Sequence, residues 1–220
     1  MVNFRRILMS AAGVMITAVS VGAFKFAAFG VDPFQSFMCG IDTCLPFDFG
    51  TLYVIVNALL LIFSLVFNRH YIGIATFINL FFLGYVVSFS QNMLEALFPS
   101  ASMIIRTASF LSGFLFLCLG SSLYMTADLG VSTYDAVALI LSEKFKIGRF
   151  HYVRITTDII CILLGIALFL LSGGSIAAVT SFVGIGTILT AFCMGPLISF
   201  FNRKLSSKLL GHGSSKDICA

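Results

Sequence analysis

Charge is scarce in this sequence. Only 10% of its 220 residues are Asp, Glu, Lys or Arg, whereas 59% are hydrophobic and the mean hydropathy is +1.07. Soluble domains are about 45–50% apolar and about 25% charged, so the composition excludes an ordinary soluble fold. The lipid bilayer is the solvent that fits this apolar surface. The net charge of +4 comes from Lys and Arg in loops and tail, which is typical of cytoplasmic loops and gives no support for nucleic-acid binding.

Motifs for catalysis and metal binding are also missing. The sequence has no HExxH, P-loop or GxSxG motif and no His–carboxylate cluster with metal spacing. We therefore expect no enzymatic activity, no metal and no cofactor. Three of the six cysteines lie in apolar runs, where a thiol behaves as a small hydrophobe. Cys39 and Cys44 share a polar segment, and either a disulfide between them or two free thiols fits the sequence.

Six apolar stretches are long enough to be considered membrane spans, because crossing the hydrocarbon layer takes roughly 20 apolar residues. Residues 7–24 follow two arginines and resemble a signal peptide. Residues 107–127 hold the same place in the second half of the chain, which favours a retained first span. The remaining stretches are 51–67, 71–94, 150–171 and 175–201. The pattern predicts an all-α, polytopic membrane protein.

Two shorter segments, 31–46 and 131–143, bring the number of hydrophobic segments to eight. Each contains an aspartate and begins directly after Gly30 or Gly130. An ionised Asp facing lipid costs several kcal/mol, so we expect both segments to be short helices surrounded by protein. They either cross the membrane thinly or enter it and return to the same side.

An internal repeat relates the two halves at an offset of one hundred residues. The order of segments is the same in both halves: long span, Gly-Val break, short polar helix, span, span. The matched positions are Phe24/Tyr124, Ala27/Ala127, Phe29/Leu129, Gly30/Gly130, Val31/Val131, Phe34/Tyr134 and Gln35/Asp135. We interpret residues 1–100 and 101–205 as two tandem four-segment repeats, followed by a disordered cytoplasmic tail over 206–220.

The Gly-Val breaks are the candidate functional site. Gly30 and Gly130 are expected to end one helix, after which Asp32-Pro33 and Ser132-Thr133 begin the next. On one interpretation, Asp32 and Ser132 are helix caps and nothing more. On the other, two helix starts carry partial positive charge at a repeat interface, where transporters hold substrates. The candidate substrate-binding residues are Asp32, Gln35, Ser132, Thr133 and Asp135.

Four further polar residues lie within apolar spans. Arg154 and Asp158 are four residues apart and share a helix face, which favours a structural ion pair over a coupling-proton site. Asn57 and Asn79 lie in the middle of spans, where hydrogen bonding between helices is the expected role.

The repeated pattern of a long span, G-V-x-x-[FY]-[QD], a short helix and two spans resembles the YczE/YyaS/YitT family of bacterial integral membrane proteins. The most similar stretch is GVSTYDAVALILSEKFKIGRFHYVRITTDI, residues 130–159, and the resemblance covers residues 7–202. Gln35 departs from the family pattern, which usually has Asp there. The resemblance implies a helical membrane protein without a large soluble domain, in a family described mainly as uncharacterised or transport-related.

The topology stays open at this level. If both short helices cross, there are eight crossings and the repeats are parallel. If both re-enter, there are six crossings and the second repeat is inverted. Either arrangement puts both termini inside and two basic residues outside, Lys25 with Arg69 or Lys25 with Arg106, so the positive-inside rule does not choose.

The function expected from these patterns is a permease of the bacterial plasma membrane, with its site at the two breaks and a small polar or anionic solute as substrate. The alternative is a non-transporting partner that stabilises or regulates another membrane complex. A homodimer would help to bury the polar short helices. Every one of these interpretations requires that the protein is embedded in the lipid bilayer.

Overall fold

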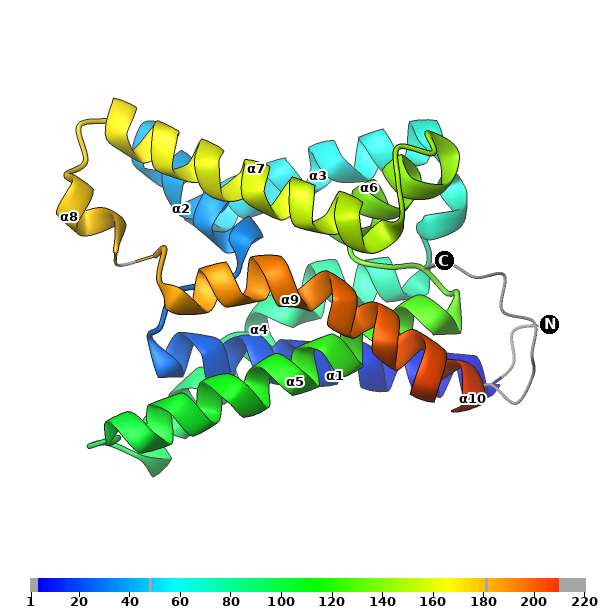
Figure 1. The fold of residues 1–220 in the computed structure, drawn as a ribbon, viewed down its shortest axis with the longest axis horizontal. Helices are drawn as coiled ribbons and strands as arrows, with labels where there is room; N and C mark the ends of the chain where they lie inside the picture. Colours follow the sequence, from blue (N-terminus) through cyan, green and yellow to red (C-terminus); the bar gives the residue numbers. More distant parts are fainter. Residues whose placement is uncertain (1–3, 48, 181, 210–220) are drawn as a thin grey trace.

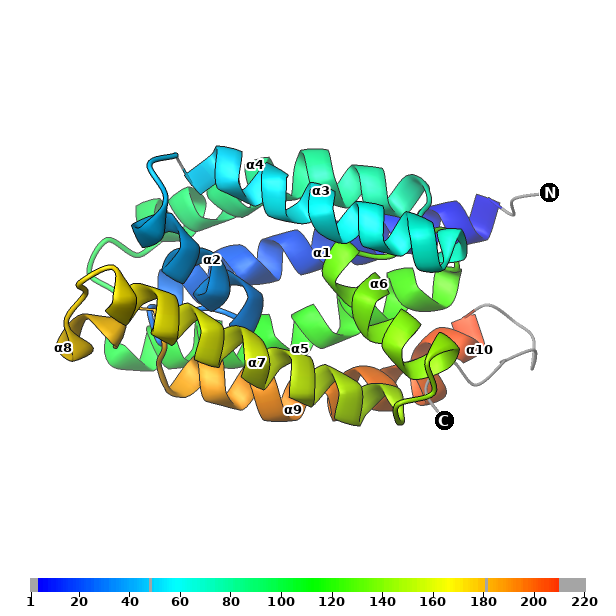
Figure 2. The same cartoon turned by 90° about the horizontal axis from the view of Figure 1, so that it is seen from above.

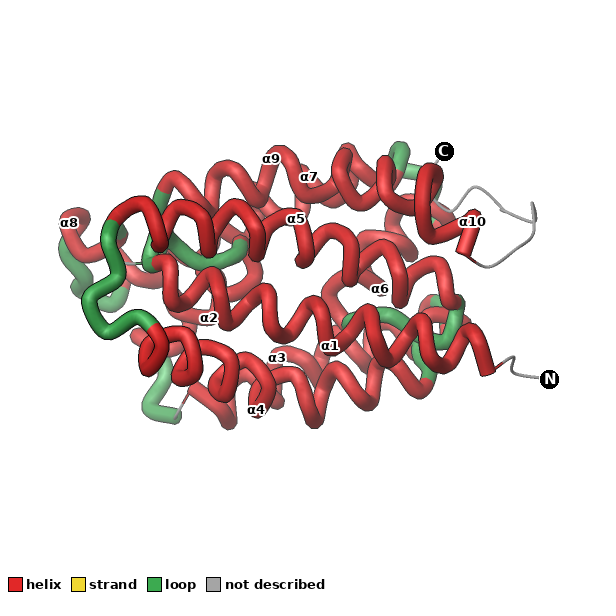
Figure 3. Tube along the Cα trace, turned by 90° about the horizontal axis from the view of Figure 1, so that it is seen from below, coloured by secondary structure: helices red, strands yellow, loops and turns green. Residues whose placement is uncertain are grey.

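The computed structural model describes residues 4–47, 49–180 and 182–209, and the regular structure in these ranges is entirely helical (Figures 1 and 3). The all-α prediction is therefore confirmed. The elements are α1 (Phe4–Ala27), α2 (Pro33–Cys44), α3 (Phe49–Phe67), the short 3-10 turn η1 (Arg69–Tyr71), α4 (Ile74–Leu97), α5 (Met103–Ala127), α6 (Thr133–Leu139), the π-helical turn η2 (Ile140–Lys144), α7 (Phe150–Leu171), α8 (Ile176–Val179), α9 (Ile185–Phe201), the π-helical turn η3 (Asn202–Ser206) and α10 (Ser207–Leu209).

The long helices have the length and composition of membrane spans. Five helices in the described ranges are long and apolar enough to cross a bilayer, namely α1, α4, α5, α7 and the continuous segment from α9 to α10. The apolar part of α3, Thr51–Phe67, is shorter. Large apolar side chains cover the outside of the bundle: Phe81, Tyr85 and Phe89 on α4 are each more than three-fifths exposed. Such a surface suits lipid rather than water.

Helices α1 and α5 pack against each other along the middle of the molecule. A Cβ on Gly13 would lie 2.7 Å from the Gly120 carbonyl oxygen, and a Cβ on Gly113 would lie 3.2 Å from the Ser20 carbonyl oxygen. Small residues therefore let the two backbones approach closely, as is common between membrane helices. Because the start of α1 lies beside the end of α5, the two helices are antiparallel (Figure 3). Helix α1 is thus an integral part of the bundle.

The helix directions bear on the two topologies that the sequence leaves open. Helices α2 and α6 extend from the middle of the bundle toward its opposite ends (Figures 1 and 2). Antiparallel α1 and α5 fit the six-crossing alternative with an inverted second half, and they are inconsistent with parallel repeats. That the halves arose as a tandem duplication stays a prediction.

The two halves exchange hydrogen bonds through the loops that follow α1 and α5. In one loop, Val31 N donates to the Phe182 carbonyl oxygen at 3.2 Å, and Thr187 Oγ1 donates to the Val31 carbonyl oxygen at 2.6 Å. In the other, Val131 N donates to the Tyr71 carbonyl oxygen at 2.9 Å, and Thr76 Oγ1 donates to the Val131 carbonyl oxygen at 2.7 Å. Each loop is therefore held by the start of the last long helix of the other half.

The sequence carries a signal for this exchange, which the sequence analysis missed. Residues 71–76 and 182–187 share the pattern [FY]-x-G-I-x-T, and the glycine and threonine begin α4 and α9 in the same way. In both segments the glycine N–H donates to the threonine Oγ1 at 3.2 Å. The spacing between them is not one hundred residues, because the second half has a longer connection before its last helix.

Two local predictions need correction. The left-handed residues that directly follow the long helices are Ala28 (φ 58°) and Asp128 (φ 57°), not the glycines. Gly30 (φ 105°) and Gly130 (φ 102°) come two residues later, where a second positive φ turns the chain back toward the bundle and favours glycine. The tail was also predicted to be disordered from residue 206, but residues 206–209 are helical; 210–220 lie outside the described ranges.

Candidate functional site

The first turn of α6 carries the most highly connected of the predicted site residues. Ser132 caps the helix, accepting from Asp135 N at 3.1 Å, as the sequence predicts. The Ser132 hydroxyl also donates to Asp135 Oδ2 at 2.6 Å, and the Tyr124 hydroxyl of α5 donates to the same oxygen. Asp135 is only 3% exposed. Its carboxylate is therefore held from both the preceding loop and α5.

Arg154 on α7 connects Asp135 to Asp158. Its Nη1 donates to Asp135 Oδ1, and its Nε lies 3.4 Å from Asp158 Oδ2. The predicted Arg154–Asp158 ion pair is thus present, but the pairing of Arg154 with Asp135 was not foreseen. The Tyr134 hydroxyl donates to Asp158 Oδ1 at 2.6 Å, and its ring centroid lies 4.3 Å from the guanidinium carbon. We refer to Asp135, Arg154 and Asp158 as the ionic cluster.

The ionic cluster holds more carboxylates than cations. All three of its side chains are at least 94% buried, and a single guanidinium lies between two carboxylates. Asp32 at the start of α2 is close enough to interact electrostatically with Arg154 as well. Buried ions are tolerated when hydrogen bonds satisfy them, yet Arg154 Nε and Asp158 Oδ2 form no hydrogen bond with any described residue. Asp158 Oδ2 is therefore the carboxylate oxygen of the cluster that retains capacity to accept a hydrogen bond.

The start of α2 lies next to the start of α6. Asp32 caps α2, accepting from Gln35 N at 3.2 Å, and Pro33 occupies the first turn, as predicted. Phe34 and Tyr134 stack with ring centroids 5.0 Å apart. These two residues are one hundred positions apart, so equivalent positions of the two halves meet. The Gln35 side chain has no hydrogen bond among the described residues.

The two asparagines within the spans differ in their contacts. Thr133 Oγ1 donates to Asn57 Oδ1 at 2.6 Å, an interhelical hydrogen bond that links α6 to α3. Asn79 is half-buried in α4, and its side chain has no hydrogen bond within the described ranges. Cys39 and Cys44 are free thiols. No group of three or more metal-ligating side chains occurs in the described part of the chain.

Two tyrosines that complete the ionic cluster were missed as candidate site residues. Tyr124 and Tyr134 match Phe24 and Phe34 at the offset of one hundred, so each adds a hydroxyl that the first half lacks. Both hydroxyls donate to the carboxylates of the cluster. The Phe-to-Tyr differences between the halves were the available signal, because a buried phenol hydroxyl usually requires a partner.

Comparison with known proteins places the chain among uncharacterised relatives. A family profile described as a family of unknown function, DUF6198, matches residues 4–203. An uncharacterized protein of Haemophilus influenzae is 26% identical over 187 residues, covering 84% of this chain and 78% of the relative. The uncharacterized membrane protein YczE of Bacillus subtilis is 26% identical over 210 residues, covering 95% of this chain and 90% of the relative. No protein of solved structure matches significantly. The YczE-like resemblance is thereby confirmed.

Proposed function

The chain belongs to the DUF6198 family, and we propose that it is a permease that moves a small polar solute across the bacterial plasma membrane. The observation that carries the proposal is the meeting of α2 and α6. Two short helices of opposite direction begin in the middle of the bundle, with Phe34 stacked on Tyr134 beside the buried ionic cluster. Broken helices at the interface of inverted halves are where transporters commonly bind their substrates.

The solute would bind where Phe34 and Tyr134 now stack. Tyr134 joins this stack to Asp158, so displacement of its ring by a solute would also free a carboxylate oxygen. Because carboxylates outnumber guanidinium groups there, the site favours a solute with hydrogen-bond donors or positive charge over an anion. The sequence predicts a polar or anionic solute, and we now propose a polar solute that is neutral or positively charged.

The short helices pack differently at their two ends, which supports alternating access. A Cβ on Gly40 of α2 would lie 2.3 Å from the Gly165 carbonyl oxygen of α7, so these backbones touch. The equivalent positions at the offset of one hundred are Ile140 and Leu65, and Leu65 remains 37% exposed. Small residues thus let α2 and α7 approach closely, whereas larger side chains occupy the matched positions of the other half, in η2 and α3. Transport would exchange these two arrangements.

The charge distribution supports cytoplasmic termini. The start of α1 and the end of α9 lie at the same end of the bundle (Figure 1). The basic residues at that end are Arg5, Arg6, Arg69, Lys144, Lys146, Arg149, Arg203, Lys204 and Lys208. Excess Lys and Arg mark cytoplasmic ends, so we assign this end to the cytoplasm.

The test begins with identification of the solute. Metabolite pools are compared between cells lacking and cells overexpressing the protein, and the solutes that change are offered to purified protein in liposomes. We expect Asp135→Asn to abolish solute movement while membrane abundance stays unchanged. The matched control is Asp42→Asn, which makes the same change on α2 outside the ionic cluster. Transport by Asp135→Asn at the unsubstituted rate would contradict the site.

The same preparation discriminates the alternative function. Purification in mild detergent yields either a homo-oligomer or a stoichiometric complex with another membrane protein. A heterologous complex that moves no solute in liposomes would support the stabilising or regulating role and reject the permease.

A further inference from the structure

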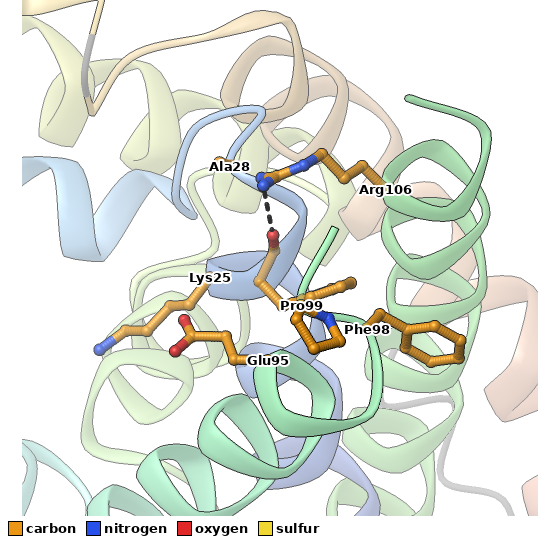
Figure 4. Close-up of a pocket in the computed structure, with 7 residues that line it drawn as sticks. Lys25, Ala28, Glu95, Phe98, Pro99 and Arg106 are labelled. Carbon is orange, nitrogen blue, oxygen red and sulfur yellow. Dashed lines mark hydrogen bonds between the residues drawn. The ribbon is translucent and has the colours of Figure 1, made fainter. Parts of the chain in front are cut away.

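A pocket of about 390 Å³ opens at the end of the bundle opposite to the termini (Figure 4). It lies where α1 ends, where α4 turns into α5 and where α5 begins. The residues that line it are Lys25, Phe26, Ala28, Glu95, Phe98, Pro99 and Arg106. The pocket is separate from the ionic cluster, and nothing in the proposed transport site requires it.

Both basic side chains of this end line the pocket. Among the described residues, Lys25 and Arg106 are the Lys and Arg side chains found at this end of the bundle, and both line the same cavity. A cavity lined by two cations and one carboxylate favours an anionic ligand.

The geometry of the two cations leaves donors available. Arg106 Nη1 donates to the Phe26 carbonyl oxygen at 3.2 Å, which fixes the guanidinium over the Phe26 ring at 5.9 Å from its centroid. The remaining N–H groups of Arg106 form no other hydrogen bond within the described ranges. Figure 4 shows Lys25 and Glu95 extending along one side of the pocket and Arg106 reaching in from the other. Lys25 forms no ion pair with another described residue, so its ammonium is also available.

The charge and surroundings of the pocket select one class of anion. Lys25, Arg106 and Glu95 together carry a net charge of +1, which matches a phosphodiester monoanion better than a doubly charged phosphate monoester. Exposed apolar side chains flank the pocket: Leu97 is 61%, Met103 68% and Ile104 80% exposed. A ligand that brings acyl chains as well as phosphate would cover them. The pocket also lies at the ends of membrane-spanning helices, which is the depth of lipid headgroups.

We propose that this pocket binds the headgroup of an anionic phospholipid, with Arg106 and Lys25 on the phosphate and Glu95 on a headgroup hydroxyl. Arg forms directed hydrogen bonds with phosphate oxygens, and Lys adds a point charge. A glycerol headgroup supplies the hydroxyl that Glu95 can accept from, whereas the choline headgroup carries none. The site therefore prefers phosphatidylglycerol to phosphatidylcholine.

The test is native mass spectrometry of the delipidated full chain, titrated with phosphatidylglycerol or phosphatidylcholine. We expect the tightest phosphatidylglycerol to be lost from Lys25→Gln/Arg106→Gln, with affinity lowered at least about tenfold. The control, Arg203→Gln/Lys204→Gln, removes two exposed cations at the other end and should bind as the unsubstituted chain does. Should the double variant fail to fold, Lys25→Gln alone must still weaken binding.

Three outcomes would overturn the proposal. Equal affinity for phosphatidylglycerol and phosphatidylcholine would remove the headgroup selectivity. Unchanged phosphatidylglycerol binding by Lys25→Gln/Arg106→Gln would place the lipid elsewhere. Displacement of the lipid by inorganic phosphate at equal concentration would assign the pocket to a free anion. Glu95→Gln serves as an internal check: it should narrow the preference for phosphatidylglycerol while keeping phosphate binding.

Discussion

Arg154 is shared between two carboxylates, and this decides what each member of the ionic cluster contributes to stability. Its guanidinium faces Asp135 on one side and Asp158 on the other. The sequence spacing predicts the contact between Arg154 and Asp158, but it gives no sign that Arg154 also pairs with Asp135. In the folded chain, loss of either aspartate still leaves Arg154 paired, whereas loss of Arg154 leaves both carboxylates buried without a cation.

Arg154→Leu is therefore expected to be the most damaging substitution in the cluster. It should lower the free energy of unfolding by about 3–5 kcal/mol, the usual cost of breaking a buried ion pair from one side. Asp158→Asn should cost less, because Asp135 still pairs with the guanidinium. Recovery should require Arg154→Leu with both Asp135→Asn and Asp158→Asn. Thermal unfolding in detergent measures the series, and equal losses for Arg154→Leu and Asp158→Asn would contradict the shared pairing.

Tyr124 offers a second test at the same scale. Tyr124→Phe removes the hydroxyl that donates to Asp135 and restores the residue found at the matched position, Phe24. The expected loss is about 1.5–3 kcal/mol, as for hydrogen bonds to charged groups. Tyr85→Phe is the control, because Tyr85 is 80% exposed on α4. Equal unfolding temperatures for the two variants would mean that the Asp135 contact adds nothing to stability.

Helices α4 and α9 begin with the same glycine–threonine hydrogen bond, and in each the threonine also binds the loop of the opposite half. Thr76 and Thr187 accept from a glycine N–H and donate to the carbonyl oxygen of Val131 or Val31. A single threonine thus fixes a helix start and a loop at once. The two short helices are positioned by these contacts as well as by their own caps.

Thr76→Val and Thr187→Val should destabilise the chain to a similar degree. Each leaves a carbonyl oxygen and a glycine N–H, both at least partly buried, without their hydrogen-bond partner, at about 1–3 kcal/mol. Thr76→Ser and Thr187→Ser keep the hydroxyl and should recover most of the loss. Thr156→Val is the control, because the exposed Thr156 hydroxyl bonds only within its own helix. Strongly unequal losses in denaturant unfolding would argue against equivalent roles for the two loops.

The whole molecule is a bundle whose halves run in opposite directions and are joined along α1 and α5. With α1 antiparallel to α5, residue 69 lies at the end that carries the termini, and residue 100 lies at the opposite end. The eight-crossing alternative would reverse the sides of both residues.

Cysteine labelling distinguishes the two arrangements. In a background where Cys44, Cys193 and Cys219 are serine, Arg69→Cys should react with an impermeant maleimide only after the membrane is permeabilised. Ser100→Cys should react in intact cells. Reaction of Arg69→Cys but not Ser100→Cys in intact cells would reject the six-crossing arrangement. Reaction of both in intact cells would show that the two loops do not lie on opposite sides of the membrane.

Composition and local pattern were enough to predict the membrane class, both helix caps and the long helices, except that the stretch 175–201 divides into α8 and α9. Apolar length determines what crosses a bilayer, and a cap depends on residues three positions apart, so neither requires distant contacts. The Asp32 and Ser132 caps and the Arg154–Asp158 spacing are local in this sense, and they are present as predicted.

The contacts of the candidate site were decided by the tertiary structure alone. Asp135 pairs with Arg154, and Phe34 stacks on Tyr134. Lys25 and Arg106 line the same pocket. These contacts depend on how the helices that carry the residues pack together. The direction of the second half was likewise open, since basic residues balanced in both topologies. Sequence periodicity describes one helix at a time, whereas ion pairing and helix direction depend on which faces approach, here through the small residues Gly13 and Gly120.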